Sequence, residues 1–104
     1  MSGVTTTTWT GDDPPDESSV RALLEKESTQ IELWANASGD RYPVHSHEYH
    51  KVVYCVEGSI WFMITDERDR EVELNPGDRI DIPAGVRHSA IAGMDGVTCL
   101  EAHR

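Results

Sequence analysis

Residues 77–88 read GDRIDIPAGVRH, and together with residues 45–58, HSHEYHKVVYCVEG, they decide the fold of this chain. The first of these stretches has the spacing Gly-x5-Pro-x-Gly-x2-His and ends at His88. Its Pro-Ala-Gly segment, residues 83–85, predicts a tight turn that ends one strand and directs the next. The other stretch has the spacing His-x-His-x3-Lys-x6-Gly and ends at Gly58.

Short β-leaning runs surround both stretches and follow one short helix. Apolar residues at positions 20, 23 and 24 fall at helical spacing, and Asp16 or Ser18 can cap a helix that ends near Ser28. Turn signals, among them residues 57–58 and 93–96, separate the runs. Even spacing of this kind predicts an all-β sandwich or barrel. The predicted strands are residues 30–35, 41–47, 52–56, 59–65, 71–74, 79–82, 88–92 and 97–102.

The length of 104 residues allows one domain with a single core, predicted to be residues 20–104. Residues 1–19 are polar, acidic and rich in proline and threonine, so we expect a flexible segment there. Cys55 and Cys99 are too few for a disulfide framework and are predicted to be buried free thiols.

The net charge of −10 disfavours nucleic acid and anionic membrane surfaces as partners. The sequence has neither a secretory signal pattern nor an apolar run near the roughly 20 residues of a membrane span. We therefore expect a cytoplasmic protein with no nucleic-acid or membrane partner.

His45 and His47 are the first candidate metal ligands. Residues two apart on a strand point to the same face about 7 Å apart, so both imidazoles can reach one ion. A lone His-x-His pair is more often an exposed cluster, but His88 after the predicted turn offers a third imidazole. Three imidazoles in a small β protein suit one transition metal ion.

At this point the chain resembles the cupin superfamily. The first motif of this family is His-x-His, followed after three or four residues by Glu and after six more by Gly. The second motif is Gly-x5-Pro-x-Gly-x2-His-x3-Asn. The resemblance spans residues 31–102 and implies an antiparallel double-stranded β-helix, the jelly-roll cupin barrel, with the metal in one mouth. It also implies a homodimer, and one divalent transition metal, Fe, Mn, Ni or Zn, held by His45, His47 and His88.

Two departures from the family pattern bear on the site. Lys51 stands where the family places an acidic ligand, and Ala92 stands where the second motif ends in Asn. An ammonium does not bind a cation, so a divalent ion among three neutral imidazoles would keep its full charge of +2. Lys51 can point into the cavity, where it would suit a carboxylate or enolate, or out to solvent; the sequence leaves both open.

Other residues are candidates for a fourth ligand or for the pocket. His50 and Glu48 lie in the bend before Lys51, although His50 has the opposite strand parity to His45 and His47. Glu101 and His103 are further options, with solvent exposure near the chain end as the plain alternative. Arg87 near the mouth could meet an anion or be an ordinary surface residue.

Strand parity predicts the lining of the cavity and of the core. Small residues follow Lys51 and His88 on the same faces of their strands, so the cavity would have room for a small ligand. The sequence does not choose between two sets that could fill the barrel, residues 60, 62 and 64 or residues 61 and 63. The predicted lining residues are Val53, Cys55, Ala90 and Ala92.

Three functions fit these features. The favoured one is a metal-binding cupin that acts on or binds a small anionic or carbonyl-bearing molecule with oxygenase-type chemistry, similar to three-His cupins that cleave diketones, thiols or aromatic acids. The alternatives are a sugar-type isomerase or epimerase, which needs a general base among Glu48, His50 and Glu101, and a non-catalytic ligand-binding cupin. The sequence assigns no catalytic residue.

Overall fold

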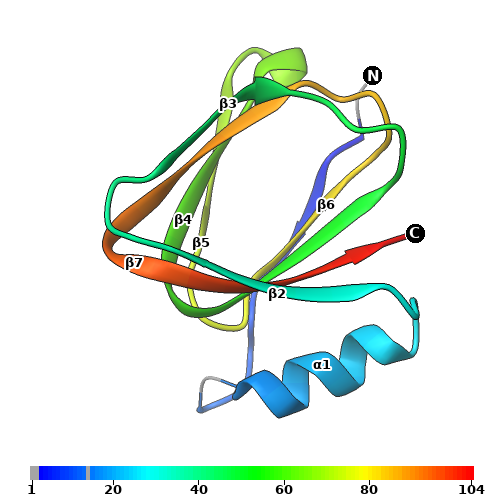
Figure 1. Cartoon of the computed structure of the whole chain (residues 1–104), viewed down its shortest axis with the longest axis vertical. Helices are drawn as coiled ribbons and strands as arrows, with labels where there is room; N and C mark the ends of the chain where they lie inside the picture. The colour runs from blue at the N-terminus through cyan, green and yellow to red at the C-terminus, as the bar shows by residue number, and fades with distance from the viewer. Residues whose placement is uncertain (1–2, 14) are drawn as a thin grey trace.

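The computed structural model describes residues 3–13 and 15–104 and consists of antiparallel strands with one α-helix (Figure 1). The predicted all-β class with a short N-terminal helix is confirmed. The elements in chain order are β1 (Thr5–Thr7), α1 (Glu17–Glu25), β2 (Ile31–Asn36), β3 (Arg41–His45), β4 (Lys51–Ile64), the 3-10 turn η1 (Thr65–Glu67), β5 (Arg70–Leu74), β6 (Arg79–Ile82) and β7 (His88–His103).

The strands form one sheet that curls around a core. Its order is β1-β6-β4-β7-β2, with β3 added to β7 and β5 added to β4. The end strands β1 and β2 do not pair with each other among the described residues, so the sheet is curled and open, more a sandwich than a closed barrel. Within residues 3–13 and 15–104, no helix has the length and apolar character to cross a membrane.

β4 and β7 are the longest strands, with 14 and 16 residues, and they curve together at the left of Figure 1. They pair from Lys51 opposite His103 to Ile64 opposite His88. The prediction of turns at residues 57–58 and 93–96 is therefore wrong, since each predicted pair of short strands is one continuous strand.

A glycine bulge explains this difference. The register of β4 against β7 shifts on both sides of Gly58, whose φ is +74°. A Cβ at Gly58 would lie 2.0 Å from the carbonyl oxygen of Gly96 on β7. Glycine is needed here for a bulge that bends the strand pair, and the same residue type in the sequence is equally typical of a turn.

The inner face of the curled sheet carries the main core. Ile60, Phe62 and Ile64 are buried there, whereas Trp61 and Met63 are 44% and 38% exposed, which decides between the two predicted sets. The four residues predicted to continue the faces of Lys51 and His88 are buried in the same core, as parity indicated. Both cysteines in the chain are buried free thiols, as predicted.

The outer face of β4 and β7 carries a second core under α1. Asp16 caps the helix by accepting a hydrogen bond of 2.8 Å from the backbone N–H of Ser19. Val20 and Leu24 are fully buried against β4 and β7 residues such as Val52 and Leu100. The nine-residue helix is too short to be stable alone, so this packing is what stabilises it.

The segment before the helix contacts the sheet. Val4 is 6% exposed and belongs to the main core, and β1 pairs with β6 from Thr5 opposite Asp81 to Thr7 opposite Arg79. The sequence did not predict this strand because a threonine run shows no apolar alternation. The mobility expected of residues 1–19 stays a prediction, and residues 1, 2 and 14 lie outside the described residues.

Candidate metal centre

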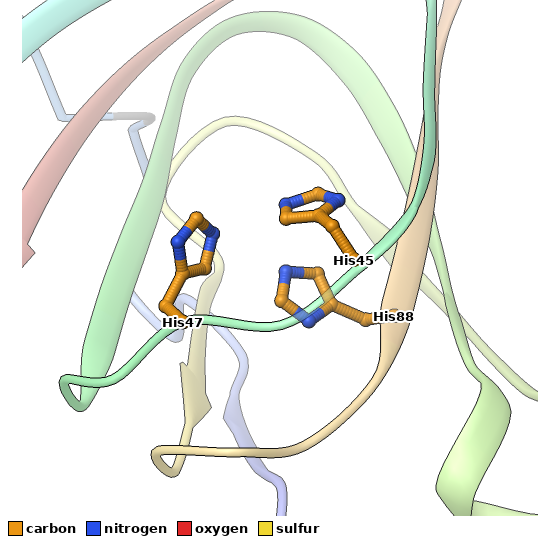
Figure 2. A group of neighbouring side chains, drawn as sticks. All are labelled: His45, His47 and His88. Carbon is orange, nitrogen blue, oxygen red and sulfur yellow. The ribbon is translucent and has the colours of Figure 1, made fainter.

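Three imidazoles meet at one end of the curled sheet (Figure 2). His45 ends β3 and is the strand partner of His88 at the start of β7, while His47 follows β3 by two residues. Ring centroids are 4.4 Å apart for His45 and His88, 4.7 Å for His45 and His47, and 5.5 Å for His47 and His88. The structure thus brings together the three residues that the two motifs predicted.

Backbone carbonyls fix the orientation of two of these rings. Nδ1 of His45 lies 2.7 Å from the carbonyl oxygen of Pro43, and Nδ1 of His88 lies 2.9 Å from that of Val86. A carbonyl only accepts, so each Nδ1–H donates and each neutral ring keeps a lone pair on Nε2. This arrangement is the usual way in which a protein orients a metal-binding histidine.

Two ring nitrogens in the cluster have no partner within the described part of the chain. Nε2 of His47 and Nε2 of His88 are buried and make no hydrogen bond to residues 3–13 or 15–104. Buried polar atoms are normally satisfied, so such orphans need an explanation. A metal ion bound by both lone pairs would provide it.

The spacing of the three candidate ligand atoms is consistent with one ion. They all lie within 4.8 Å of one another. Two nitrogens bound to one ion at about 2.1 Å lie roughly 3.0 to 3.4 Å apart, so small side-chain rotations would complete the coordination. An all-imidazole set suits Zn, Fe or Ni better than Mg or Ca, which prefer oxygen ligands.

Electrostatics keep these histidines ready to bind a metal. Burial lowers the pKa of His88, which is 1% exposed, to about 4, with smaller contributions from neighbouring positive groups. Burial, followed by the charge of Lys51, also lowers the pKa of His47. Both rings are neutral near pH 7, so protons do not compete with a metal for their lone pairs.

A small cavity of about 80 Å³ lies beside the cluster. Pockets for drug-sized ligands have volumes of roughly 300 to 1,000 Å³, so this cavity suits a ligand of only a few non-hydrogen atoms. Aromatic and apolar side chains form most of its wall, and charged groups stand at one side. The lining residues are Trp34, Tyr42, His45, Lys51, Ile60, Phe62, His88, Ala90 and Glu101.

Lys51 points into this cavity, which settles the orientation that the sequence left open. The residue is 9% exposed, and its Nζ lies 3.2 Å from Oε1 of Glu101. Glu101 also accepts hydrogen bonds from Nε1 of Trp34 at 3.2 Å and from Nε2 of His103 at 2.9 Å. Burial alone would raise the pKa of Glu101, but the charge of Lys51 and the bond from His103 more than offset it, so the carboxylate stays ionised.

The other candidate residues stand apart from the three-histidine cluster. Glu48 is exposed in the bend after His47. His50 directs its Nε2 to the Asp81 carboxylate at 3.1 Å, and Arg87 is paired with Asp66 at the surface. None of Glu48, His50 and Arg87 lies in the cluster or lines the small cavity.

From the sequence alone, Glu101 was only a further candidate for the site, with solvent exposure as the alternative. Parity counted from His88 fails beyond the glycines of β7, and the position near the chain end favoured exposure. The useful signal is the register, since Cys99 lies opposite Cys55 and Glu101 opposite Val53. Residues directly opposite share a face, so the inward face of β4 also places Glu101 inward.

Three comparisons with known proteins bear on this site. A family model described as a cupin domain matches residues 33–100. The chain is 48% identical over 52 residues to quercetin 2,3-dioxygenase of Bacillus subtilis (strain 168), a match that covers 49% of this chain and 14% of that protein. It is 32% identical over 68 residues to acireductone dioxygenase 1 of Vitis vinifera, covering 64% of this chain and 36% of that one.

A solved structure agrees on the fold. A duf861 family protein from Thermotoga maritima superposes with a TM-score of 0.64 at 14% identity, covering 97% of this chain and 99% of that one. The chain spans well under half the length of the two dioxygenases. The similarity to them therefore concerns a part of each enzyme and not the whole of either.

Proposed function

Because the chain belongs to the cupin-domain family, we propose that it is a metal-dependent enzyme with oxygenase-type chemistry, acting on a small anionic or carbonyl-bearing molecule. The observation that carries this proposal is the cluster of His45, His47 and His88 beside a small, partly open cavity. The two relatives named as dioxygenases support the choice of chemistry over the matched residues.

The roles of the side chains follow from their positions. His45, His47 and His88 would hold one divalent transition metal, Fe, Mn, Ni or Zn. Such an ion supplies Lewis-acid polarisation and a template for the substrate and, if it is iron, the activation of dioxygen. Ile60 and Phe62 line the cavity with apolar surface, which strengthens electrostatic interactions beside it.

The size of the cavity limits the range of possible substrates. About 80 Å³ does not hold a three-ring flavonol such as quercetin, so we propose a substrate with a short carbon chain. A short diketone, enediol or oxo acid fits both the volume and the positive charge of a metal with Lys51. The proposed substrate of this chain therefore differs from the one in the name of the quercetin enzyme.

The isomerase alternative has less support from the contacts. It needs a general base beside the metal, and Glu101 is the one carboxylate of the described chain that lines the cavity. Both of its oxygens already accept hydrogen bonds, from Lys51 and Trp34 on one side and from His103 on the other. A carboxylate held in this way is a poor proton acceptor for a substrate carbon.

Oxygen consumption tests the proposal. Protein loaded with Fe(II) is expected to consume dioxygen with at least one member of a panel of short diketones, enediols, thiols and oxo acids. Quercetin should give no consumption above the level of free iron. The His45→Ala variant serves as the control and should reduce the rate by more than about 100-fold, as expected for loss of a metal ligand. Consumption equal to that of free iron with the whole panel would favour the non-catalytic ligand-binding alternative.

We further propose that the chain forms a homodimer through the outer face of β3, β7, β4 and β5. Arg41, Ile91, Trp61 and Glu73 are successive partners across these four strands and share that face. Trp61 is 44% exposed, and no ion pair is recorded for Arg41 or Glu73 within the described residues. A two-fold axis parallel to the strands would lay β3 of one copy over β5 of the other, so Arg41 would meet Glu73 of the second copy.

Light scattering after size exclusion tests this dimer. Wild-type protein should have the mass of two chains, and Trp61→Glu should raise the dissociation constant by about 30-fold or more, as expected for a buried aromatic hot spot. Arg41→Glu should weaken the dimer, and adding Glu73→Arg should restore it. A monomeric wild type, or a dimer unaffected by Trp61→Glu, would place the interface elsewhere.

A further inference from the structure

We infer that Lys51 binds the second negative charge of a short dianion whose first charge binds the metal, so that the chain selects dianions over monoanions. This inference rests on the proposed three-histidine metal site. It concerns a residue at which the chain departs from the family pattern.

Lys51 is a fixed ammonium with unused donors. Glu101 is the one acceptor recorded for its Nζ among the described residues, at 3.2 Å. An ammonium carries three N–H donors, so donors remain for a further acceptor within the cavity that Lys51 lines. With the residue only 9% exposed, bulk water has little access to satisfy them.

Glu101 acts as a counterion and not as a metal ligand. Its oxygens accept hydrogen bonds from Lys51, Trp34 and His103, which lie on β4, β2 and β7 respectively. It is also outside the cluster of candidate ligand atoms. Three donors around one carboxylate hold it in place, so Lys51 is held in place in turn, facing the space beside His45 and His88.

The charge balance of the cavity then favours two negative charges on the ligand. A histidine binds a metal through Nε2 as a neutral imidazole, so the three histidines add no charge to the site. Lys51 and Glu101 cancel, so a divalent ion in the site would leave a net charge of +2. Uncompensated charge in a cavity with mostly apolar walls is costly. A dianion removes all of it, whereas a monoanion leaves +1.

The positions of the metal site and of Lys51, together with the volume of the cavity, limit the chemical class of the ligand. One negative group would bind at the imidazole cluster and the other beside Lys51, so the ligand must have acidic oxygens at both ends. A cavity of about 80 Å³ limits it to a short chain. Short dicarboxylates and the enolates of oxo acids are the chemical class that meets both conditions.

Binding of malonate to zinc-loaded protein, followed by calorimetry, tests the inference without turnover. Wild-type protein should bind malonate more tightly than propionate by about 10-fold or more, the usual effect of one charge-assisted hydrogen bond. Zinc content is measured in the same samples. Less than about 0.1 zinc per chain in wild type would overturn the metal site, and this inference with it.

A double variant that leaves the net charge of the cavity unchanged tests whether Lys51 itself contacts the ligand. Lys51→Met combined with Glu101→Gln keeps the net charge of the cavity and retains an acceptor for Trp34. We expect unchanged zinc content and a malonate affinity lowered by about 10-fold, the contribution of the Lys51 contact, while the charge of the metal still favours a dianion. If malonate affinity stays within about 3-fold of wild type while zinc is retained, Lys51 is only a structural partner of Glu101 and the inference is wrong.

Two single variants make the test independent of how well the double variant folds. Lys51→Arg keeps a positive donor and should keep the preference for malonate. Lys51→Glu restores the acidic residue of the family pattern, so it should retain zinc more tightly and bind malonate more weakly. Zinc and malonate affinities that change in the same direction in Lys51→Glu would contradict the inference.

Discussion

His88→Ala is expected to lower the affinity for zinc by more than about 100-fold, since loss of outer-shell partners alone costs 10- to 100-fold and His88 is a proposed direct ligand. His88 is the most buried of the three histidines, and its Nδ1 contact with Val86 directs its Nε2 lone pair to the cluster. No other histidine, cysteine or carboxylate of the described residues joins this cluster, so none can replace it. Competition with a chromophoric chelator measures the effect.

His50→Ala is the matched control for this experiment. His50 lies three residues after His47, but its ring contacts Asp81 and is outside the cluster. We expect its zinc affinity to stay within about 3-fold of wild type. Equal losses in His50→Ala and His88→Ala would mean that zinc binds elsewhere or that both variants unfold, and circular dichroism distinguishes the two.

Gly58→Ala is expected to destabilise the fold by about 2 to 4 kcal/mol, which is a large part of the stability of a small domain. The φ of Gly58 is +74°, which costs an L-residue energy in any environment. The added Cβ would also lie 2.0 Å from the carbonyl oxygen of Gly96, a backbone atom of the neighbouring strand. Either β4 and β7 separate at the bulge or the residue changes its φ.

Gly39→Ala isolates the first of these effects, the cost of the positive φ. Gly39 has nearly the same φ, +75°, but nothing lies within 4 Å of its added Cβ. Its cost should be limited to the backbone contribution of about 1 to 2 kcal/mol. Urea unfolding of both variants gives the comparison. Equal destabilisation of the two would show that the close approach of β4 to β7 is not a constraint on residue 58.

The sequence alone predicted the parts of the fold that depend on local patterns. Alternation along β4 and β7 correctly placed Val53 and Ala90 in the core, because residues two apart share a face. The helix followed from spacing, and Asp16 is one of the two residues that the sequence offered as its cap. Gly58 was misread as a turn, because a glycine with positive φ suits a turn and a bulge equally and only the partner strand distinguishes them.

The candidate site was predicted in part for a similar reason. His45, His47 and His88 lie in two stretches whose residue spacing identified them as candidate ligands, although His47 lies beyond the end of β3. The pairing of Lys51 with Glu101 joins positions 50 residues apart in the sequence and depends on the register between β4 and β7. That register depends on the bulge at Gly58, so the alternation of residues along either strand alone could not predict it.

Metal content tests the central claim most directly. Wild-type protein purified without chelators, together with His45→Ala and His88→Ala, is analysed for transition metals by mass spectrometry. The three-histidine site implies about one ion per chain in wild type and close to none in either variant, because metal-binding histidines act together on one ion. Equal metal content in all three proteins, whether high or low, would contradict a metal centre at His45, His47 and His88.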